Sequence, residues 1–395
     1  MNIILFDHAD IRQALLPLTF TRPVSAIRVG ILTIAEKWAK RLEKPISYYT
    51  SEYLREKYAF TPGGDNYWIN GAVCPNNQII EAAKTLQPET ALVFDGLLLM
   101  ARTSSSTYED LESLTRIELS FSGSIIRQPW QIFKENAIQI KEDFSFITKG
   151  RTSQPISDPH TIVYGKENIF IEEGAKIRAA IINAEDGPVY IGKNAVISEG
   201  AIVKGALALC EGAQIGMGAK LRGDSTIGPY SKVGGEVSNS VIFGYSNKGH
   251  DGFLGNSVLG EWCNLGADTN TSNLKNNYAD VKIWDYAKNS FKDTGEMFCG
   301  LIMGDHSKCG INTMFNTGTV VGVSANIFGA GFPRNFIPSF SWGGANGFTT
   351  FQLSKADEVA EKVMERRNVV YSDLEQRIIK SIFEQTVEYR YWEKK

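Results

Sequence analysis

Histidine, whose charge changes near neutral pH, is scarce in this sequence, with four copies among 395 residues. One of them, His250, lies in a glycine-rich segment, and a neutral imidazole is a suitable general base near pH 7. Asn264 follows fourteen residues after His250, and Asn273 follows twenty-three residues after it. A lone histidine in a loop is most often a solvated polar residue, so the spacing to the two asparagines is what favours a shared site.

The elements that must position these residues are indicated by a six-residue repeat that begins at residue 191. One position of each hexad is apolar, the next is often glycine, and the residue four positions on is small. Such self-similarity is the signature of a solenoid, and three hexads of one strand and one turn make a triangular coil. The apolar series is Ile191, Ile197, Val203, Leu209, Ile215, Leu221, Ile227, Val233, Phe253, Leu259, Leu265, Met303, Cys309, Phe315, Val321 and Ile327.

The repeat predicts a β-solenoid from about residue 160 to about residue 345, with interruptions at 179–189 and 275–301. A solenoid wall cannot absorb such segments, so we expect both to loop out, where binding residues often lie. Cys309 takes an apolar core position and Cys263 a small corner position, so both residues indicate packing.

The flanks of the repeat have different patterns. Before it, short apolar runs predict strands around a helical stretch at 31–42, which is typical of an α/β domain. After it, an apolar stripe predicts helices that pack against the solenoid or a neighbouring subunit. We expect an α/β domain at 1–155, an all-β parallel β-helix at 156–345 and a C-terminal helical tail at 346–395. The predicted strands are 3–6, 46–49, 67–69 and 91–94.

Composition excludes several classes of protein. Forty-one Lys and Arg residues oppose forty-four Asp and Glu residues, a net charge of −3, whereas a nucleic-acid binder usually carries a basic surplus. No apolar run reaches the roughly 18 residues that span a bilayer, and the first residues do not read as a secretory signal. The five cysteines form no Cys-x-x-Cys, which is typical of a reduced, cytoplasmic protein without structural zinc.

The order of α/β domain, β-helix and tail resembles the bifunctional bacterial enzymes that make UDP-N-acetylglucosamine. Leu-Pro-Leu-Thr-Phe-Thr-Arg-Pro at 16–23, followed by Arg-Val-Gly-Ile-Leu-Thr at 28–33, resembles an alternate branch of that family. The resemblance implies a nucleotidyltransferase-like domain that transfers UMP from UTP, and a left-handed β-helix that acetylates glucosamine-1-phosphate from acetyl-CoA. It also implies a homotrimer, because the grooves of such β-helices form between neighbouring prisms.

The segment Gly-His-Asp-Gly-Phe-Leu-Gly around His250 resembles the catalytic segment of the family. This implies that His250 deprotonates an acceptor amine that attacks a thioester. Asn264 and Asn273 match the asparagines that bind and orient acceptor and thioester, and Glu236 falls where a Glu orients the base. Arg222 resembles the phosphate-binding arginine, which suits a planar guanidinium, although a surface charge explains it equally well.

Three positions depart from the family pattern. Phe253 replaces the tyrosine of the catalytic segment and lacks a hydroxyl that could bind phosphate. Ser238 stands where a lysine would join the arginine on that phosphate, and Ile311 stands where a serine lies near the leaving thiol. We therefore expect Phe253 to line an altered acceptor pocket, while acyl transfer itself is retained.

The N-terminal domain lacks the Gly-rich loop with which nucleotidyltransferases of this type cradle a triphosphate. Phe-Asp-His-Ala-Asp at 6–10 stands near the place of that loop. Arg22, Arg28 and Lys37 are candidates to bind nucleotide phosphates, although a cationic helix face is an equally good interpretation.

The sequence does not decide which residues of this domain would hold a metal ion. Uridylyl transfer needs a carboxylate to hold Mg²⁺. The family's Gly-Asp after a strand is Asn70-Gly71 here, and Asn is a weaker, neutral ligand. Asp7 and Asp95 are the spare carboxylates.

These features together predict a sugar-nucleotide enzyme that joins an acetyl-CoA-dependent N-acetyltransferase to a Mg²⁺-dependent, UTP-type nucleotidyltransferase. Its partners would be a sugar phosphate and an NTP, not nucleic acid or membrane. The alternative is a nucleotidyltransferase alone, with the β-helix as an oligomerisation or regulatory scaffold, and a third is a non-enzymatic assembly module. A zinc hydratase is disfavoured, because it needs three clustered histidines and the repeats hold only His250 and His306.

Overall fold

The structure is a computed structural model that describes residues 2–394. The chain forms two compact units, which are described separately. The second unit contains Leu16–Phe20, Arg28–Ile31 and the chain from Pro129 onward, and the rest of the chain to Gln128 makes the first. Two short N-terminal segments and the helix after Gln128 therefore pack with the β-helix.

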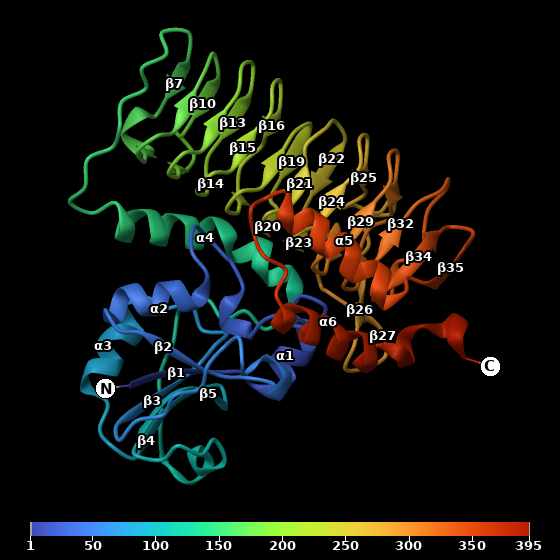
Figure 1. The fold of residues 1–395 in the computed structure, drawn as a ribbon. Coiled ribbons are helices and arrows are strands. Elements are labelled where there is room, and N and C mark those ends of the chain that lie inside the picture. The colour runs from blue at the N-terminus through green and yellow to red at the C-terminus, as the bar shows by residue number, and fades with distance from the viewer. Residues whose placement is uncertain (1, 395) are drawn as a thin grey trace. The chain divides into compact units, whose positions relative to one another are not determined.

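The first unit is built on a six-stranded mixed sheet in the order β2-β1-β3-β5-β4-β6 (Figure 1). The apolar runs form its strands because their side chains, such as Ile4, Phe6 and Trp68, are buried in one core. All four predicted strands are confirmed to within one residue at each end. The elements are β1 (Asn2–Phe6), α1 (Ala9–Ala14), α2 (Ile34–Leu42), β2 (Ile46–Tyr49), β3 (Asn66–Asn70), α3 (Asn77–Thr85), β4 (Thr90–Phe94), β5 (Leu97–Thr103) and β6 (Thr115–Glu118).

Helix α2 begins three residues later than the predicted stretch at 31–42 because Thr33 caps it. The Thr33 hydroxyl accepts from the Glu36 backbone N–H at 3.2 Å, and the Glu36 carboxylate accepts from the Thr33 N–H at 2.7 Å. This reciprocal capping box satisfies two N–H groups that the first turn leaves without partners.

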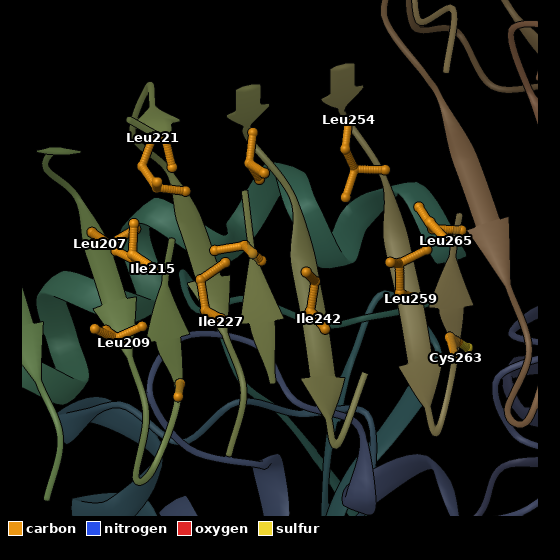
Figure 2. Close-up of a cluster of buried hydrophobic side chains, with 14 of the residues drawn as sticks. Leu207, Leu209, Ile215, Leu221, Ile227, Ile242, Leu254, Leu259, Cys263 and Leu265 are labelled. Atoms are coloured by element: carbon orange, nitrogen blue, oxygen red, sulfur yellow. The ribbon is translucent and has the colours of Figure 1, made fainter. Parts of the chain in front are cut away.

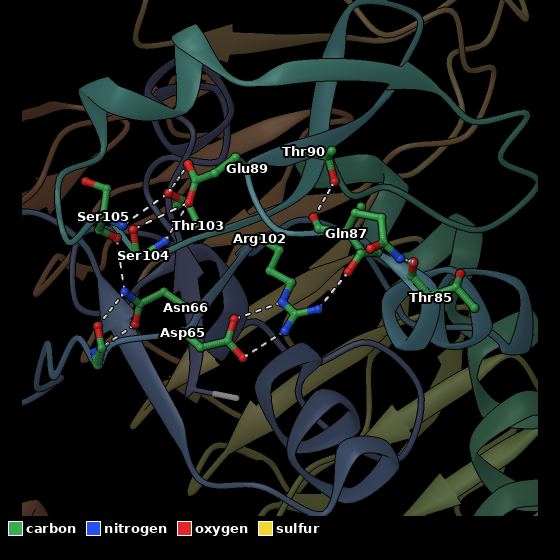
Figure 3. Close-up of polar contacts among 12 residues, drawn as sticks. Asp65, Asn66, Thr85, Gln87, Glu89, Thr90, Arg102, Thr103, Ser104 and Ser105 are labelled. Carbon is green, nitrogen blue, oxygen red and sulfur yellow. Dashed lines mark hydrogen bonds and ion pairs between the residues drawn. The ribbon is translucent and has the colours of Figure 1, made fainter.

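Polar side chains fasten the loops at one end of β3 and β5 (Figure 3). Arg102 pairs with Asp65 at 2.8 Å and donates to the backbone oxygen of Leu86 at 2.9 Å. The Thr103 hydroxyl donates to Glu89 at 2.8 Å. These contacts fasten the loops to the ends of two interior strands of the sheet.

The second unit is a parallel β-helix with three long walls, which confirms the predicted fold class. A coil gives one short strand to each wall over most of the length, as the six-residue period requires, and the last coils contribute to the second and third walls only. The first wall comprises β7 (Ile162–Tyr164), β10 (Ile181–Asn183), β13 (Ile202–Lys204), β16 (Lys220–Leu221), β19 (Glu236–Ser238) and β22 (Phe253–Gly255), and β25 (Asn270–Thr271) pairs with β30 (Met314–Phe315) beyond it. The second wall comprises β8 (Ile169–Ile171), β11 (Val189–Ile191), β14 (Leu207–Leu209), β17 (Ser225–Ile227), β20 (Val241–Gly244), β23 (Val258–Glu261), β28 (Leu301–Met303), β31 (Thr319–Val321) and β33 (Phe336–Ile337). The third wall comprises β9 (Lys176–Ile177), β12 (Val196–Ile197), β15 (Gln214–Ile215), β18 (Lys232–Val233), β21 (Asn247–Lys248), β24 (Asn264–Leu265), β29 (Lys308–Cys309), β32 (Asn326–Ile327), β34 (Ser341–Gly344) and β35 (Gly347–Thr350).

The core of the β-helix consists of the inward apolar residues, which stack in rows from coil to coil (Figure 2). Small residues fill the corners, and where they are serines their hydroxyls donate to neighbouring carbonyls, as Ser246 does to Gly260 at 2.8 Å. The prediction of a core position was wrong for Phe253, because the coil from Val237 to Leu254 is shorter than three full hexads. Leu254 therefore faces the core and Phe253 faces outward.

The two predicted interruptions differ in the structure. The segment 179–189 does not loop out as a whole, since β10 and the start of β11 pair within the walls. The segment 275–301 does leave the walls and forms an antiparallel hairpin of β26 (Lys282–Asp285) and β27 (Ser290–Asp293). The shorter segment stays in the walls because Ile182 and Val189 supply the inward side chains that the coil needs.

Three helices cover the β-helix: α4 (Pro129–Ile147), α5 (Leu353–Glu365) and α6 (Asp373–Gln385). Helix α4 lies along the second wall, against β14, β17, β20 and β23. The predicted helical tail begins with strand β35, which pairs with β34, before α5 starts. None of the described helices is long and apolar enough to cross a membrane.

Candidate active site

A row of polar residues follows the outer surface of the third wall. Asn247, Asn264 and Lys308 are aligned in the successive strands β21, β24 and β29, and each precedes a residue that faces the core. Because side chains alternate across a strand, the residue before an inward one faces outward. The coil register therefore places Asn264, a predicted site residue, beside Lys308, an amine that the sequence analysis did not identify.

A pocket of about 860 Å³ lies over this row. The strands form one side of it, and α5 with the residues that follow α5 forms the other. Arg367 fastens the two sides, because its Nη2 donates to Oδ1 of Asn247 at 2.9 Å. The pocket also contains His250, so the structure brings His250 and Asn264 to one site.

Lys248 stabilises the turn that carries His250 from within the core of the β-helix. The side chain of Lys248 occupies an inward position in β21, and its Nζ donates to the backbone oxygens of His250 at 2.7 Å and Gly234 at 3.0 Å. Burial lowers the pKa of Lys248 to about 8, against the opposing influence of Asp251 and Asp268. An ammonium group inside the core thus fixes the backbone of the candidate base.

Gly252 lets the same turn close. Its φ is +107°, and a Cβ at this position would collide with the carbonyl of Thr269. On the far side of the turn, the Phe253 N–H donates to Oδ1 of Asn270 at 2.9 Å. The backbone around His250 is therefore fixed, while the His250 side chain is exposed.

A ladder of stacked rings forms the corner between the second and third walls. Tyr230, Tyr245 and Trp262 each adopt a left-handed φ, between 52° and 62°, directly before a small corner residue. Ring centroids lie 5.1 Å apart for Tyr230 and Tyr245 and 4.2 Å apart for Tyr245 and Trp262. Tyr245 and Trp262 line the pocket, which gives it a flat apolar surface suited to a planar ligand ring.

Lys308 is half-buried in this pocket. Its Nζ donates to the backbone oxygen of His306 at 2.7 Å, and no carboxylate of residues 2–394 lies within ion-pair distance of it. Burial lowers the pKa of Lys308 to about 8, while burial raises the pKa of the adjacent Cys263 thiol to about 12. Cys263 is thus inert packing at neutral pH, whereas Lys308 is a candidate functional residue.

The other predicted residues of the β-helix lie on the first wall. Arg222 Nη1 pairs with Glu236 Oε1 at 3.0 Å, and Glu236 is aligned with Phe253 in the next strand. Asn273 lies further along, where its Nδ2 donates to Oδ1 of Asn256 at 2.8 Å. Within the described chain, no hydrogen bond or ion pair joins any of these side chains to His250, which stands at the corner between this wall and the pocket.

The predicted phosphate-binding cations of the N-terminal region are buried. Arg28 belongs to the second unit, where its Nε donates to the Phe243 backbone oxygen at 3.2 Å and its Nη1 donates to that of Ile31. Arg22 and Lys37 belong to the first unit, and each is less than a twentieth exposed. The guanidinium of Arg28 therefore supports the backbone, and phosphate binding by the three residues stays a prediction.

Two of the three candidate Mg²⁺ ligands, Asp7 and Asn70, do not fit a metal site, and the third, Asp95, is exposed. The Asp7 carboxylate accepts hydrogen bonds from Arg12, Thr50 and Val24, and burial raises the pKa of Asp7 against these contacts. The Asn70 amide is buried and bonds to the backbone of Leu98 and Ala72, so its oxygen is occupied. Among the described residues, no group of three or more His, Cys, Asp or Glu side chains is arranged to hold a metal.

Comparison with known proteins assigns the N-terminal part of the chain. Residues 3–152 match the family model for sugar nucleotidyl transferases. The region matched includes β1 to β6 and helix α4, which packs on the β-helix.

The curated relatives carry the names of bifunctional enzymes. The chain is 30% identical over 169 residues to a bifunctional sugar-1-phosphate nucleotidylyltransferase/acetyltransferase of Sulfurisphaera tokodaii, covering 42% of this chain and 40% of that protein. It is 25% identical over 211 residues to bifunctional protein GlmU of Trichormus variabilis, covering 52% and 41%. It is 36% identical over 87 residues to GlmU of Methanocaldococcus jannaschii, covering 22% and 21%. The predicted resemblance to bifunctional enzymes is confirmed, and the chain spans about two fifths of the length of the first of these relatives.

Proposed function

We propose that the chain is a bifunctional transferase of sugar-nucleotide synthesis, in which the β-helix transfers an acetyl group from acetyl-CoA to the amine of an amino-sugar phosphate. One observation carries the proposal: the pocket over the third wall combines an exposed imidazole, a carboxamide row, stacked rings and several cations. The bifunctional relatives support both activities, and the glucosamine-1-phosphate acceptor follows from the sequence resemblance.

The pocket suits the phosphorylated, adenine-bearing tail of coenzyme A. Lys232, Lys308 and Arg366 line it, and no Asp or Glu does, so its field favours an anion. The partly exposed Tyr245 ring, stacked on the buried Trp262 ring, offers the adenine a flat contact. These groups lie in the same pocket as His250, so a coenzyme A bound there would place its thioester near the base.

The reaction proceeds by general base catalysis. The imidazole of His250 takes a proton from the acceptor amine as that nitrogen attacks the thioester carbonyl carbon. The C–N bond forms, the C–S bond breaks, and the thiolate leaves with the proton that the imidazolium returns. Asn264, on the same side of the pocket, would donate its amide N–H to the carbonyl oxygen as negative charge develops there.

The residues on the first wall would act in an oligomer. We propose that a second copy of the chain, in a homotrimer, presents its first wall to this pocket, so that Arg222 binds the sugar phosphate and Glu236 orients the base. Phe253 and Asn273 would then line the acceptor side. The Arg222 side chain is 66% exposed, so the guanidinium N–H groups that do not pair with Glu236 can reach an anion.

The N-terminal domain would transfer a nucleotidyl group from UTP to a sugar-1-phosphate and so complete UDP-N-acetylglucosamine in the cytoplasm. The family-model match at residues 3–152 supports this assignment. Arg22 and Lys37 are proposed to face phosphate when the substrate is bound. Because Asp7 and Asn70 do not fit a metal site, we derive no step through Mg²⁺.

The test measures release of coenzyme A thiol from acetyl-CoA with glucosamine-1-phosphate as acceptor. His250→Gln should lower the rate by about 10²–10⁴-fold, the usual contribution of a general base. His160→Gln is the matched control, because His160 is exposed and lies outside the pocket. An unchanged rate in His250→Gln would remove His250 from the mechanism.

A second candidate, a nucleotidyltransferase with a β-helix scaffold, is favoured by one observation: the family-model match stops at residue 152. It predicts pyrophosphate release from UTP and a sugar-1-phosphate, with no thiol release for any amino sugar. Running both assays on one preparation separates the two functions.

A further inference from the structure

The hairpin of β26 and β27 builds a second pocket, of about 650 Å³, in the β-helix unit. Its residues come from four parts of the chain: the insertion that holds the hairpin, Thr317, the segment around Arg334, and Tyr391 near the C-terminus. It shares no lining residue with the pocket beside His250.

Aromatic side chains make the walls of the hairpin pocket. Trp284 and Phe336 stack almost parallel, with ring centroids 4.1 Å apart and an interplanar angle of 8°. Phe291 meets Trp284 edge-on, at 5.4 Å and 81°, and remains 46% exposed. The Trp284 indole N–H is buried and has no acceptor among the described residues. The pocket therefore offers flat apolar surface, and one of its wall side chains carries a buried hydrogen-bond donor without a partner.

Cations surround this surface. The Arg334 guanidinium lies 4.9 Å from the centroid of the Tyr391 ring, and none of the described carboxylates pairs with it. Lys275 and Lys282 also line the pocket; Lys282 pairs with the Asp293 carboxylate at 3.5 Å, and the Lys275 Nζ donates to the backbone oxygen of Asp280. No Asp or Glu lines the pocket, so its charge favours an anion.

We propose that the hairpin pocket binds a nucleoside phosphate. A planar base would stack within the aromatic walls, and a phosphate would lie against the guanidinium of Arg334, whose planar fork suits phosphate oxygens. The Thr317 hydroxyl supplies a further polar group at the same pocket. Inorganic phosphate would leave the rings unused and a free nucleoside would leave the cations unused, so neither alone satisfies the site. This proposal does not rest on the function proposed above.

Photolabelling tests the proposal at the level of the site. The full chain is irradiated with 8-azido-AMP or with 5-azido-UMP and digested with trypsin, which releases residues 283–288 and 289–292 as separate peptides. We expect one of the two probes to label these peptides. The matching nucleotide should compete, whereas adenosine, uridine and inorganic phosphate at the same concentration should not. Labelling at any other nucleotide site falls on different peptides.

Two variants distinguish specific binding in the hairpin pocket from nonspecific labelling. Arg334→Ala should reduce labelling of the hairpin peptides about tenfold, and Arg178→Ala, which removes an exposed arginine paired with Glu199 at 3.8 Å, should not change it. Phe291→Ala, at an exposed ring, provides a second variant that should reduce labelling and keep the fold. The proposal is wrong if neither probe labels the hairpin, or if Arg334→Ala and Phe291→Ala label as well as the parent chain.

Discussion

The pocket beside His250 and the pocket at the hairpin obtain their side chains in different ways. In the first, Asn247, Asn264 and Lys308 come from the same position of successive coils, and the coil register sets their order. In the second, Trp284 meets Phe336 because a segment that leaves the walls folds back onto β33. A coil repeat supplies rows of like positions, whereas an insertion supplies contacts that only tertiary packing defines.

The stabilising interactions differ in the same way. The turn at His250 is held by Lys248 from within the core and by the backbone conformation of Gly252. The hairpin is held by ring contacts among side chains, including Tyr286 against Phe336 at 5.5 Å. A change in the β-helix core should therefore affect the first pocket and the whole unit, while a change in the hairpin should remain local.

The largest expected effect comes from truncation in the β-helix core. Leu259→Ala should destabilise the unit by about 3 kcal/mol, because Leu259 is fully buried and its removal leaves a cavity. The measurement is urea unfolding followed by circular dichroism. Ile283→Ala, at a buried position of the hairpin, is the matched variant and should leave the main transition in place while it increases protease cleavage within 275–301. Equal shifts of the main transition in both variants would contradict the difference between the regions.

A smaller effect is expected at the turn that carries His250. Gly252→Ala should destabilise by about 2 kcal/mol, because the residue has φ of +107° and a Cβ would meet the Thr269 carbonyl. Gly249→Ala in the same turn should cost less than about 0.5 kcal/mol, since no atom lies within 4 Å of its added Cβ. Thermal unfolding compares the two variants. A Gly252→Ala chain as stable as Gly249→Ala would show that this turn can relax.

The pH dependence of stability should report on Lys308. Its pKa is about 8 in the folded chain and about 10.4 when unfolded, so the unfolded state binds more protons between these values. Stability should therefore rise as the pH increases from about 8 to about 9.5, and the rise should be smaller in Lys308→Met. Lys204→Met is the control, because Lys204 is exposed and paired with Asp186. Urea midpoints across this range provide the measurement, and an unchanged slope in Lys308→Met would contradict the assigned environment.

The smallest effect is expected for Arg222 and Glu236. In the isolated chain this exposed ion pair should contribute less than about 1 kcal/mol to stability, as measured by a double-mutant cycle of Arg222→Ala and Glu236→Ala. The same variants should lower acetyl transfer much more than they lower stability if the first wall completes the site in an oligomer. Loss of stability without loss of activity would restrict the pair to a structural role.

Much of the fold is predictable from sequence because a solenoid repeats one local rule. The hexad period identifies the inward residues, and it fails at Phe253 only where a coil is shorter than three hexads. Lys308 could have been predicted by continuing the register of the hexad repeat across the insertion. It precedes the inward Cys309 as Asn264 precedes the inward Leu265. The left-handed aromatic corner also leaves a signal, which is a ring directly before four successive small residues: Ser231, Ser246, Cys263 and Ser307.

Other parts of the site carry no such signal. The covering of the third wall by α5 depends on contacts between distant segments, as Arg367 with Asn247 shows. The burial of Arg28 depends on its membership of the β-helix unit, which a local pattern does not reveal. The hairpin pocket likewise joins residues from Lys275 to Tyr391, whose meeting no periodicity encodes.

The rings of Tyr230, Tyr245, Trp262 and His306 form a column at one corner of the β-helix, and this column shows how the fold tolerates an added segment. The chain passes from Trp262 through β24 and β25, leaves the walls for the hairpin before β28, and returns to the same column at His306, whose ring lies 6.3 Å from that of Trp262. The coils above and below the departure keep their alignment, so an added segment leaves the stack intact. A prism of this kind can therefore carry a long insertion between two walls while the coils on either side keep the core that supports it.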